Sequence, residues 1–342
     1  MSILDARKDA ILRAVIEDHI ETAEPVGSEA LSHRLRLGVS PATIRNEMAA
    51  LEDLGFLSHP HTSAGRVPTD HGYRLYVDAV LREARLTPQE RARARRPVSV
   101  LTEGPVRMAE EAARTLASVT DYASVVSPPR PGRLLFKHVH FIPFRSTQVL
   151  AVIVTNAGVT EGKVLDLGEP LDAEDLDRLS RMVSRRLDGR LLGDITDELL
   201  AEVVAEAAWQ QRVIQALAAW LRRYLPVVQR RVFVDGTANI LKQPEFADAR
   251  TAQPVLVALE EAEIFTDLLR QESARQVWVT IGTENRAIAL HGCSIVAATY
   301  GGRDHPAGAL AIVGPTRMKY GKAIAMVRYL AHGLTAALED SA

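Results

Sequence analysis

A stretch of alternating polar and apolar residues at positions 40–54 carries the side chains best suited to recognition chemistry. Ser40 followed by Pro41 makes a strong helix start, because a serine hydroxyl caps the first free N–H groups and proline suits the first helical position. The apolar residues that share one face, and that we expect to pack inward, are Ile44, Met48, Leu51 and Leu54. The opposite face is thereby left for contacts outside the helix.

That opposite face has the chemistry needed to read a DNA groove. Ala42 and Ala49 are small and allow a close approach, while Thr43, Arg45 and Asn46 offer hydrogen bonds to base edges and phosphates. The N-terminus of the helix also favours a phosphate. The pattern predicts nucleic-acid recognition, although three short helices with a hairpin also occur in protein-interaction modules.

Two earlier helices must hold this face in position. Apolar residues at helical spacing predict a first helix that ends near Glu21, with a weak capping-box signal at Ser2. Ser28 is a good N-cap for a short second helix that extends through Leu35. Gly38 fits the turn that follows, so the second and third helices make a helix-turn-helix.

A hairpin is expected directly after the third helix. Residues 58–69 are polar and rich in turn formers, which predicts a β-hairpin wing with Gly65 at its bend. Arg66, beside the bend, is a side chain that can enter a minor groove or hold a phosphate. Thr69 or Asp70 then caps a further helix.

Charge does not single out this region as a DNA-binding surface. The 342-residue chain has a formal net charge of −2, so any nucleic-acid footprint must be local. Residues 28–75 contain five basic and five acidic side chains and are therefore neutral overall. A positive face there has to arise from arrangement.

Seven short motifs carry a resemblance to a known family. They are the runs at positions 25–28, 40–46, 51–57, 63–69, 235–241, 282–285 and 314–318, which include Ser-Pro-Ala-Thr-Ile-Arg-Asn, Gly-Thr-Glu-Asn and Gly-Pro-Thr-Arg-Met. Together they span nearly the whole chain, which resembles the HrcA family of heat-inducible transcription repressors.

This resemblance implies a fold, a partner and a mode of action. It implies an α+β protein with an N-terminal winged helix-turn-helix, a GAF-like antiparallel sheet domain and an inserted helical dimerising domain. It also implies a homodimer that binds an inverted-repeat operator in double-stranded DNA and represses chaperone operons until heat relieves it, with help from the GroE chaperonin. The residues expected to contact DNA are Ser40, Ala42, Thr43, Arg45, Asn46, His61, Ser63 and Arg66.

The periodicity and the resemblance together predict four parts. These are a winged helix-turn-helix at 1–82, a basic linker at 83–100, a GAF-like domain at 101–170 and 253–342, and an inserted dimerising domain at 171–252. β-branched runs predict strands at 134–142, 148–155, 162–167, 277–281, 294–300 and 309–313. The simplest organisation is one sheet split by a helical insert. The arginine-rich linker is either a solvated hinge or a source of phosphate contacts.

Two features of the later chain allow alternatives. A hydrophobic helix around Trp209, Val213, Leu217 and Trp220 either supplies a symmetric dimer interface or packs as internal core. The GAF-like sheet either holds a small molecule or is filled by side chains. The alternative function is thus a winged-helix regulator that senses a ligand.

Other chemistry is not expected. His59, His61 and His71 have no cysteine nearby and are more simply hairpin residues than metal ligands, while His291 and Cys293 lack a third orienting group for catalysis. We therefore expect no enzyme, no cofactor and no metal. One cysteine excludes an internal disulfide and suits a reducing cytoplasm. The sequence shows no targeting segment and no run long enough to span a membrane, so a soluble, cytoplasmic protein is expected.

Overall fold

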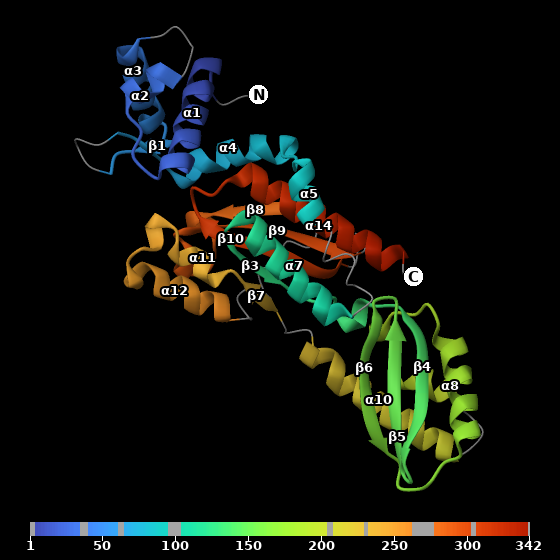
Figure 1. Ribbon diagram of the computed structural model, residues 1–342. Helices are drawn as coiled ribbons and strands as arrows, with labels where there is room; N and C mark the ends of the chain where they lie inside the picture. Colours follow the sequence, from blue (N-terminus) through green and yellow to red (C-terminus); the bar gives the residue numbers. More distant parts are fainter. Residues whose placement is uncertain are drawn as a thin grey trace.

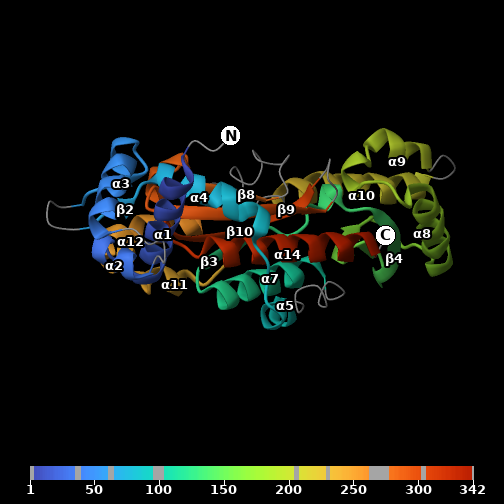
Figure 2. The ribbon, with the colours of Figure 1, turned by 90° about the horizontal axis from the view of Figure 1, so that it is seen from above.

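The protein is elongated, with three parts in a row (Figures 1 and 2). A computed structural model describes residues 4–34, 40–60, 65–94, 104–203, 208–228, 232–261, 277–301 and 306–340. The N-terminal unit lies at one end, a five-stranded sheet with its helices lies in the middle, and a smaller lobe lies at the other end. Helices and antiparallel sheets are thus combined, as expected for an α+β protein. No helix among the described residues is long and apolar enough to cross a membrane.

The N-terminal unit is built on three short helices and a two-stranded sheet. Its elements are α1 (Ala6–Thr22), α2 (Ser28–Arg34), α3 (Pro41–Asp53), β1 (Leu57–Ser58) and β2 (Val67–Pro68). Asp5, and not the predicted Ser2, caps α1, because its carboxylate accepts hydrogen bonds from the backbone N–H groups of Arg7 and Lys8. The predicted order of helix, short helix, helix and strand is confirmed, while Leu35 and Gly38 lie outside the described residues.

Two helices connect this unit to the middle of the molecule. Thr69 caps α4 (Asp70–Glu83), as predicted, by accepting a hydrogen bond from the N–H of Gly72. The predicted basic linker at 83–100 contains a second helix, α5 (Pro88–Ala94), which packs against α7 and α14. Part of this linker is therefore structured, and residues 95–103 lie outside the described residues.

The central sheet has five antiparallel strands in the order β7-β3-β10-β9-β8. Their bounds are β3 (Ala123–Val126), β7 (Phe233–Asp235), β8 (Val277–Ile281), β9 (Cys293–Gly301) and β10 (Pro306–Pro315). Helices α7 (Pro105–Thr120) and α14 (Tyr320–Asp340) cover one face, and α11 (Thr237–Leu241) and α12 (Ala249–Glu260) cover the other. Neighbouring strand residues such as Ile295 and Val296 point into different hydrophobic clusters, so both faces are buried.

The far lobe contains a second sheet with the order β4-β5-β6. Its strands are β4 (Phe136–Arg145), β5 (Gln148–Thr155) and β6 (Gly158–Asp166), and its helices are α8 (Ala173–Leu187), α9 (Asp197–Val203) and α10 (Ala208–Val228). The prediction of one sheet split by a helical insert is therefore wrong. Serines of α8 satisfy the free edge of β4, because Ser184 and Ser180 accept hydrogen bonds from the N–H groups of Val139 and Phe141.

The hydrophobic helix that allowed two interpretations packs inside this lobe. Val213, Leu217 and Trp220 of α10 are at most 8% exposed and belong to the internal core, while Trp209 is half-buried against that core. The apolar surface lies elsewhere in the lobe. Ile142 and Phe144 of β4 are about half exposed, on the outer face of the three-stranded sheet.

A close approach of two backbones fixes the base of the predicted hairpin and yields the first prediction. A Cβ at Gly65 would lie 2.3 Å from the carbonyl oxygen of Val26. Because backbone must move to admit a side chain, Gly65→Ala should lower the free energy of unfolding by about 1–3 kcal/mol. Urea unfolding of the full chain measures this. Gly27→Ala is the matched control, since a Cβ there meets nothing within 4 Å; equal stability of the two variants would contradict the constraint.

Candidate nucleic-acid interface

The start of α3 has the geometry that its sequence predicts. Ser40 has extended backbone angles, and its Oγ accepts a hydrogen bond of 3.2 Å from the N–H of Thr43. Its hydroxyl also lies 3.0 Å from that of Thr43, and Pro41 occupies the first helical position. The N-terminal turn of α3 is therefore fixed, and its remaining N–H groups point out of the helix end.

One face of α3 is buried as expected, with one exception. Ile44, Met48 and Leu51 are at most 3% exposed. Leu54, which was expected to join them, is 53% exposed. Leu54 is the C-cap of the helix, at its very end, and Gly55 then turns the chain with a φ of +79°.

The opposite face of α3 is open to solvent. Ser40, Ala42, Arg45 and Asn46 are exposed, and Thr43 is half-buried. Within the described part of the chain, neither the side chain of Arg45 nor that of Asn46 has a hydrogen-bond or ion-pair partner. The structure thus brings five of the predicted residues to one exposed helix face and leaves its long polar side chains available.

Arg66 is placed differently from the expectation. Its side chain turns back onto the end of α3, where Nε lies 2.7 Å from Oε2 of Glu52 in an ion pair that lacks hydrogen-bond alignment. It also contacts Nε2 of His59, whose Nδ1 lies 2.7 Å from Glu52. The hydrogen bond with His59, followed by the charge of Arg66, lowers the pKa of the Glu52 carboxyl. Arg66 is only 16% exposed in this arrangement.

The backbone of Arg66 is tied to the loop between α1 and α2. Its N–H and carbonyl exchange hydrogen bonds of 2.9 and 2.8 Å with Val26. Gly65 therefore lies at a close approach to Val26. His61 and Ser63, the other two expected hairpin contacts, lie outside the described residues.

His59 and His71 are engaged in other contacts. The ring of His71 stacks on Phe56 with centroids 4.6 Å apart, and His59 bridges Glu52 and Arg66. No group of side chains that could hold a metal ion is found among the described residues.

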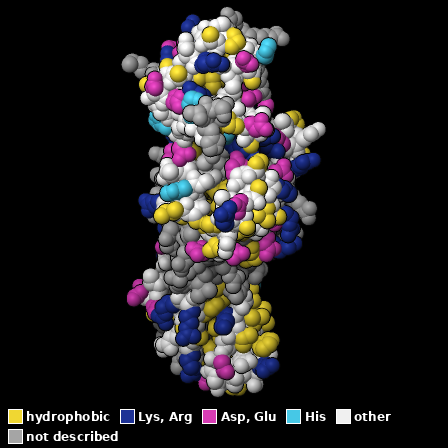
Figure 3. All heavy atoms as spheres, turned by 90° about the vertical axis from the view of Figure 1, so that its left-hand side faces the viewer, with side chains coloured by type: hydrophobic (Ala, Val, Ile, Leu, Met, Phe, Trp, Pro, Cys, Tyr) yellow, Lys and Arg dark blue, Asp and Glu magenta, His cyan; other side chains and the backbone are white. Residues whose placement is uncertain are grey.

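The surface of the N-terminal unit carries mixed charge. In Figure 3, Lys and Arg side chains are interspersed with Asp and Glu over the upper part of the molecule. For example, Glu47 on α3 pairs with Lys8 at 3.1 Å and with Arg7 at 3.6 Å. On this face of the unit, basic and acidic side chains are mixed, so the described residues there do not form a broad field of one sign.

Comparison with known proteins decides the family. A family model described as "HrcA protein C terminal domain" matches residues 107–324. The chain belongs to the HrcA family. A protein of Moorella thermoacetica is 38% identical over 339 residues, covering 98% of both chains, and one of Geobacter sulfurreducens is 36% identical over 340 residues, covering 99% of both. Both relatives are named heat-inducible transcription repressor HrcA.

A solved structure shares the fold. It is titled as the crystal structure of a hypothetical protein, and it aligns with 99% of this chain and 99% of its own at a TM-score of 0.64 and 22% sequence identity. At this identity the likeness concerns the arrangement of helices and strands alone. It extends along the entire length, so all three parts of the molecule share it.

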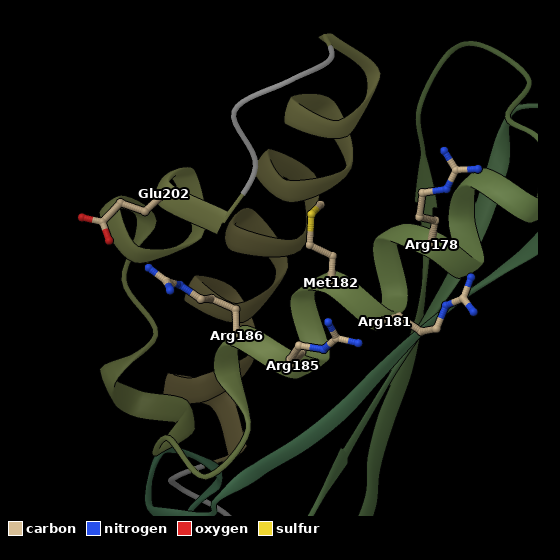
Figure 4. A pocket seen from close by; sticks show the side chains of 6 residues that line it. All are labelled: Arg178, Arg181, Met182, Arg185, Arg186 and Glu202. Atoms are coloured by element: carbon tan, nitrogen blue, oxygen red, sulfur yellow. The ribbon is translucent and has the colours of Figure 1, made fainter.

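A hollow in the far lobe is the other site with concentrated charge. Its lining residues are Arg178, Arg181, Met182, Arg185, Arg186 and Glu202 (Figure 4). Five of them lie on α8, and Arg186 extends toward Glu202 of α9. This hollow is charged and lies outside the five-stranded sheet, so it does not correspond to an apolar ligand pocket in that sheet.

Sequence reasoning missed a set of residues that touch the N-terminal unit from far along the chain. Thr283 and Glu284 contact α4, and Arg317 contacts the end of α1. All three lie in the late motifs that carried the family resemblance. No signal of helical or strand periodicity points to these contacts, because they join segments more than 200 residues apart.

The N-cap of α3 generates the second prediction. Ser40→Ala should lower the free energy of unfolding by about 1 kcal/mol, because the N–H of Thr43 loses its hydrogen-bond acceptor. Thermal unfolding followed by circular dichroism measures the change. Ser40→Asp is the matched control, since aspartate also caps helices. An equal loss of stability in Ser40→Ala and Ser40→Asp would show that the hydroxyl does not act as a cap.

Proposed function

We propose that the protein is a homodimeric winged-helix repressor that binds an inverted-repeat operator and blocks transcription of chaperone operons. The observation that carries this proposal is the exposed polar face of α3, whose Arg45 and Asn46 have no partner within the described residues. Membership of a family whose relatives are named heat-inducible transcription repressors supports it. In this proposal α3 is the recognition helix, and the hairpin after it is the wing.

The proposed contacts follow from the chemistry of each side chain. Arg45 is suited to a bidentate contact with guanine, and Asn46 to one with adenine, while Ala42 permits a close approach. Ser40 and Thr43 lie at the N-terminus of α3, where backbone N–H groups favour a phosphate. We propose that these residues lie in the major groove and that His61 and Ser63 contact the backbone of the DNA from the wing.

Arg66 acts in this proposal through an exchange of partners. Glu52 and His59 hold it while DNA is absent. A phosphate can replace Glu52, because arginine binds phosphate and carboxylate with the same fork of donors. The pair thus restrains the arginine until the wing reaches DNA.

An inverted repeat requires two copies of the chain, and the far lobe offers a surface for the second copy. The outer face of the β4-β5-β6 sheet carries half-buried to exposed apolar side chains on all three strands, beside His138 and His140 on β4. Its apolar residues are Ile142, Phe144, Leu150, Val152 and Val164. Ile142 lies opposite Leu150, and Leu150 lies opposite Val164, so these side chains form a continuous row across the sheet. We propose that this row packs on its counterpart about a two-fold axis.

The response to heat is proposed from the same architecture. A dimer made of several docked parts loses operator affinity when any one interface opens, and such interfaces are marginally stable. Assistance by the GroE chaperonin then couples the supply of active repressor to the load of unfolded clients. The alternative, regulation by a ligand in the central sheet, has less support, because both faces of that sheet are filled by side chains and helices.

The deciding experiment is fluorescence anisotropy with the full-length protein. A labelled inverted repeat from a chaperone operon and a scrambled duplex of equal length are titrated across a salt series. Tight binding to the repeat with weak, salt-dependent binding to the scramble is the expected result. Equal weak binding to both, with and without added chaperonin, would overturn the proposal.

The third prediction concerns Arg45. Arg45→Ala should cost about 1–3 kcal/mol of operator binding, because a bidentate contact with guanine is lost. The same anisotropy titration at one fixed salt concentration measures it. Arg181→Ala is the control, since Arg181 is exposed on α8 in the far lobe. Equal affinity of Arg45→Ala and the unchanged protein would remove Arg45 from the interface.

The fourth prediction concerns the dimer surface. Ile142→Glu should convert the dimer to a monomer, because it places a charge in the centre of an apolar interface. Sedimentation velocity gives the mass directly. Leu241→Glu is the control, since Leu241 is equally exposed but lies on α11 beside the central sheet. A dimer that survives Ile142→Glu would exclude this sheet face as the interface.

A further inference from the structure

The first turns of α4 are held by a loop that lies more than 200 residues later in the sequence. The carboxylate of Asp70 accepts two hydrogen bonds of 2.9 Å from Thr283, one from its N–H and one from its hydroxyl. One turn further on, Nε of Arg74 donates to Glu284 at 2.8 Å, and its Nη2 donates to the carbonyl of Val279 at 2.7 Å. Charged groups are involved on both sides, which makes these bonds directional and strong.

Each residue of the Gly282–Asn285 loop has a part in this contact. Gly282 has a φ of +54°, and a Cβ there would lie 2.2 Å from a carboxylate oxygen of Asp70, so only glycine admits the approach. The carboxylate of Glu284 also accepts from the N–H of Ile281. The buried amide of Asn285 donates to three carbonyls of its surroundings and keeps the loop in shape.

A buried arginine makes the second contact. Arg317 is 9% exposed, and its Nε donates to Glu245 at 2.5 Å. Its Nη1 donates to the carbonyl of Ile20 at 3.3 Å. Ile20 lies in the last turn of α1, where carbonyls lack helical partners and favour a positive charge. Arg317 therefore caps α1 from the central part of the molecule.

A third contact lies between the contact of the Gly282–Asn285 loop and that of Arg317, and it is made by uncharged, mostly aromatic side chains. Nδ1 of His19 lies 2.6 Å from the hydroxyl of Tyr73, whose ring packs on Tyr320 with centroids 6.0 Å apart. The Tyr320 hydroxyl in turn lies 2.7 Å from that of Ser294 on β9. Burial, followed by the charge of Arg317, lowers the pKa of His19, which keeps the imidazole uncharged in this contact.

From these contacts we infer that Gly282–Asn285 and Arg317 form a clamp that sets the orientation of the N-terminal unit on the central sheet. Apolar packing brings two bodies together, whereas directional hydrogen bonds at two separate points fix their angle. The clamp reaches α3 through rigid backbone, because Thr69 donates to the carbonyl of Phe56 and Gly72 lies against the same carbonyl. These are positioning residues, since none of them lies on the exposed face of α3.

The inference rests on the proposed function in one respect. If two copies bind an inverted repeat, the clamp sets the separation of their recognition helices and thereby selects the spacing of the half-sites. A rigid pair of recognition helices accepts one spacing, and a loosely held pair accepts several.

The test weakens the clamp without touching α3. Thr283→Val removes one donor to Asp70, and Glu284→Gln removes the charge that pairs with Arg74 while it retains an acceptor for Ile281. The double variant is compared with Thr283→Ser, which keeps the hydroxyl. Full-length proteins are titrated with operators whose half-sites are separated by one to several added base pairs, and with a single half-site.

We expect the double variant to bind the preferred operator roughly tenfold more weakly, in line with the loss of two coupled contacts. It should also lose its preference for one spacing, while its affinity for a single half-site stays within about twofold. Thr283→Ser should behave as the unchanged protein. An unchanged spacing preference, or an equal loss on the half-site, would overturn the inference, because the defect would then lie within the N-terminal unit.

A distance measurement separates the clamp from the proposed function. Spin labels at Glu24→Cys and Glu260→Cys report the position of the N-terminal unit relative to α12, and the native Cys293 is buried. The distribution of distances between the two labels should be narrow in the protein with an intact clamp and broader in the double variant. If the protein binds no operator at all, the proposed function fails, and this distribution alone decides the clamp: broadening supports it, and an unchanged width refutes it.

Discussion

Burial of the last helix, α14, against the five-stranded sheet is the interaction on which the rest of the molecule depends. Its inward side chains, among them Ile324, Val327 and Leu330, are fully buried. The same helix packs on β9, α4, α5 and α7 (Figures 1 and 2). It is therefore part of the central domain and also the surface on which α4 packs. Removing it would expose the part of the sheet around β9 and take away one of the surfaces on which α4 packs.

Local signals in the sequence were sufficient to predict α3 and insufficient to predict its surroundings. Ser40, Pro41 and the inward row of Ile44, Met48 and Leu51 are read from short-range rules, and the structure confirms them. The pairing of strands is a long-range property, and the six predicted strands fall into two sheets. The difference between the sheets is visible only in the structure: β5 alternates between buried and half-buried residues, whereas β9 and β10 are buried almost throughout. The sequence of β5 is apolar along most of its length and does not alternate.

The placement of polar side chains was harder to predict than the elements that carry them. Arg66 lies where the hairpin was expected to place it, but its guanidinium pairs with Glu52, a partner 14 residues earlier on a different element. The roles of Thr283, Glu284 and Arg317 depend on segments that meet only in the folded chain. Caps and periodicity arise within one turn of helix or strand, whereas such pairs depend on the complete tertiary fold.

The distance along the chain between Asp70 and Thr283 has a consequence for the order in which contacts can form during synthesis. A ribosome adds about 5–20 residues each second, so the 213 residues between these partners take on the order of 10–40 seconds to synthesise. Throughout that interval the residues of the N-terminal unit are already synthesised, while Thr283 and Tyr320, the later partners of Asp70 and Tyr73, are not. The end of the molecule that contains α3 is synthesised first, and the inferred clamp that orients it is complete only after Arg317 has been added.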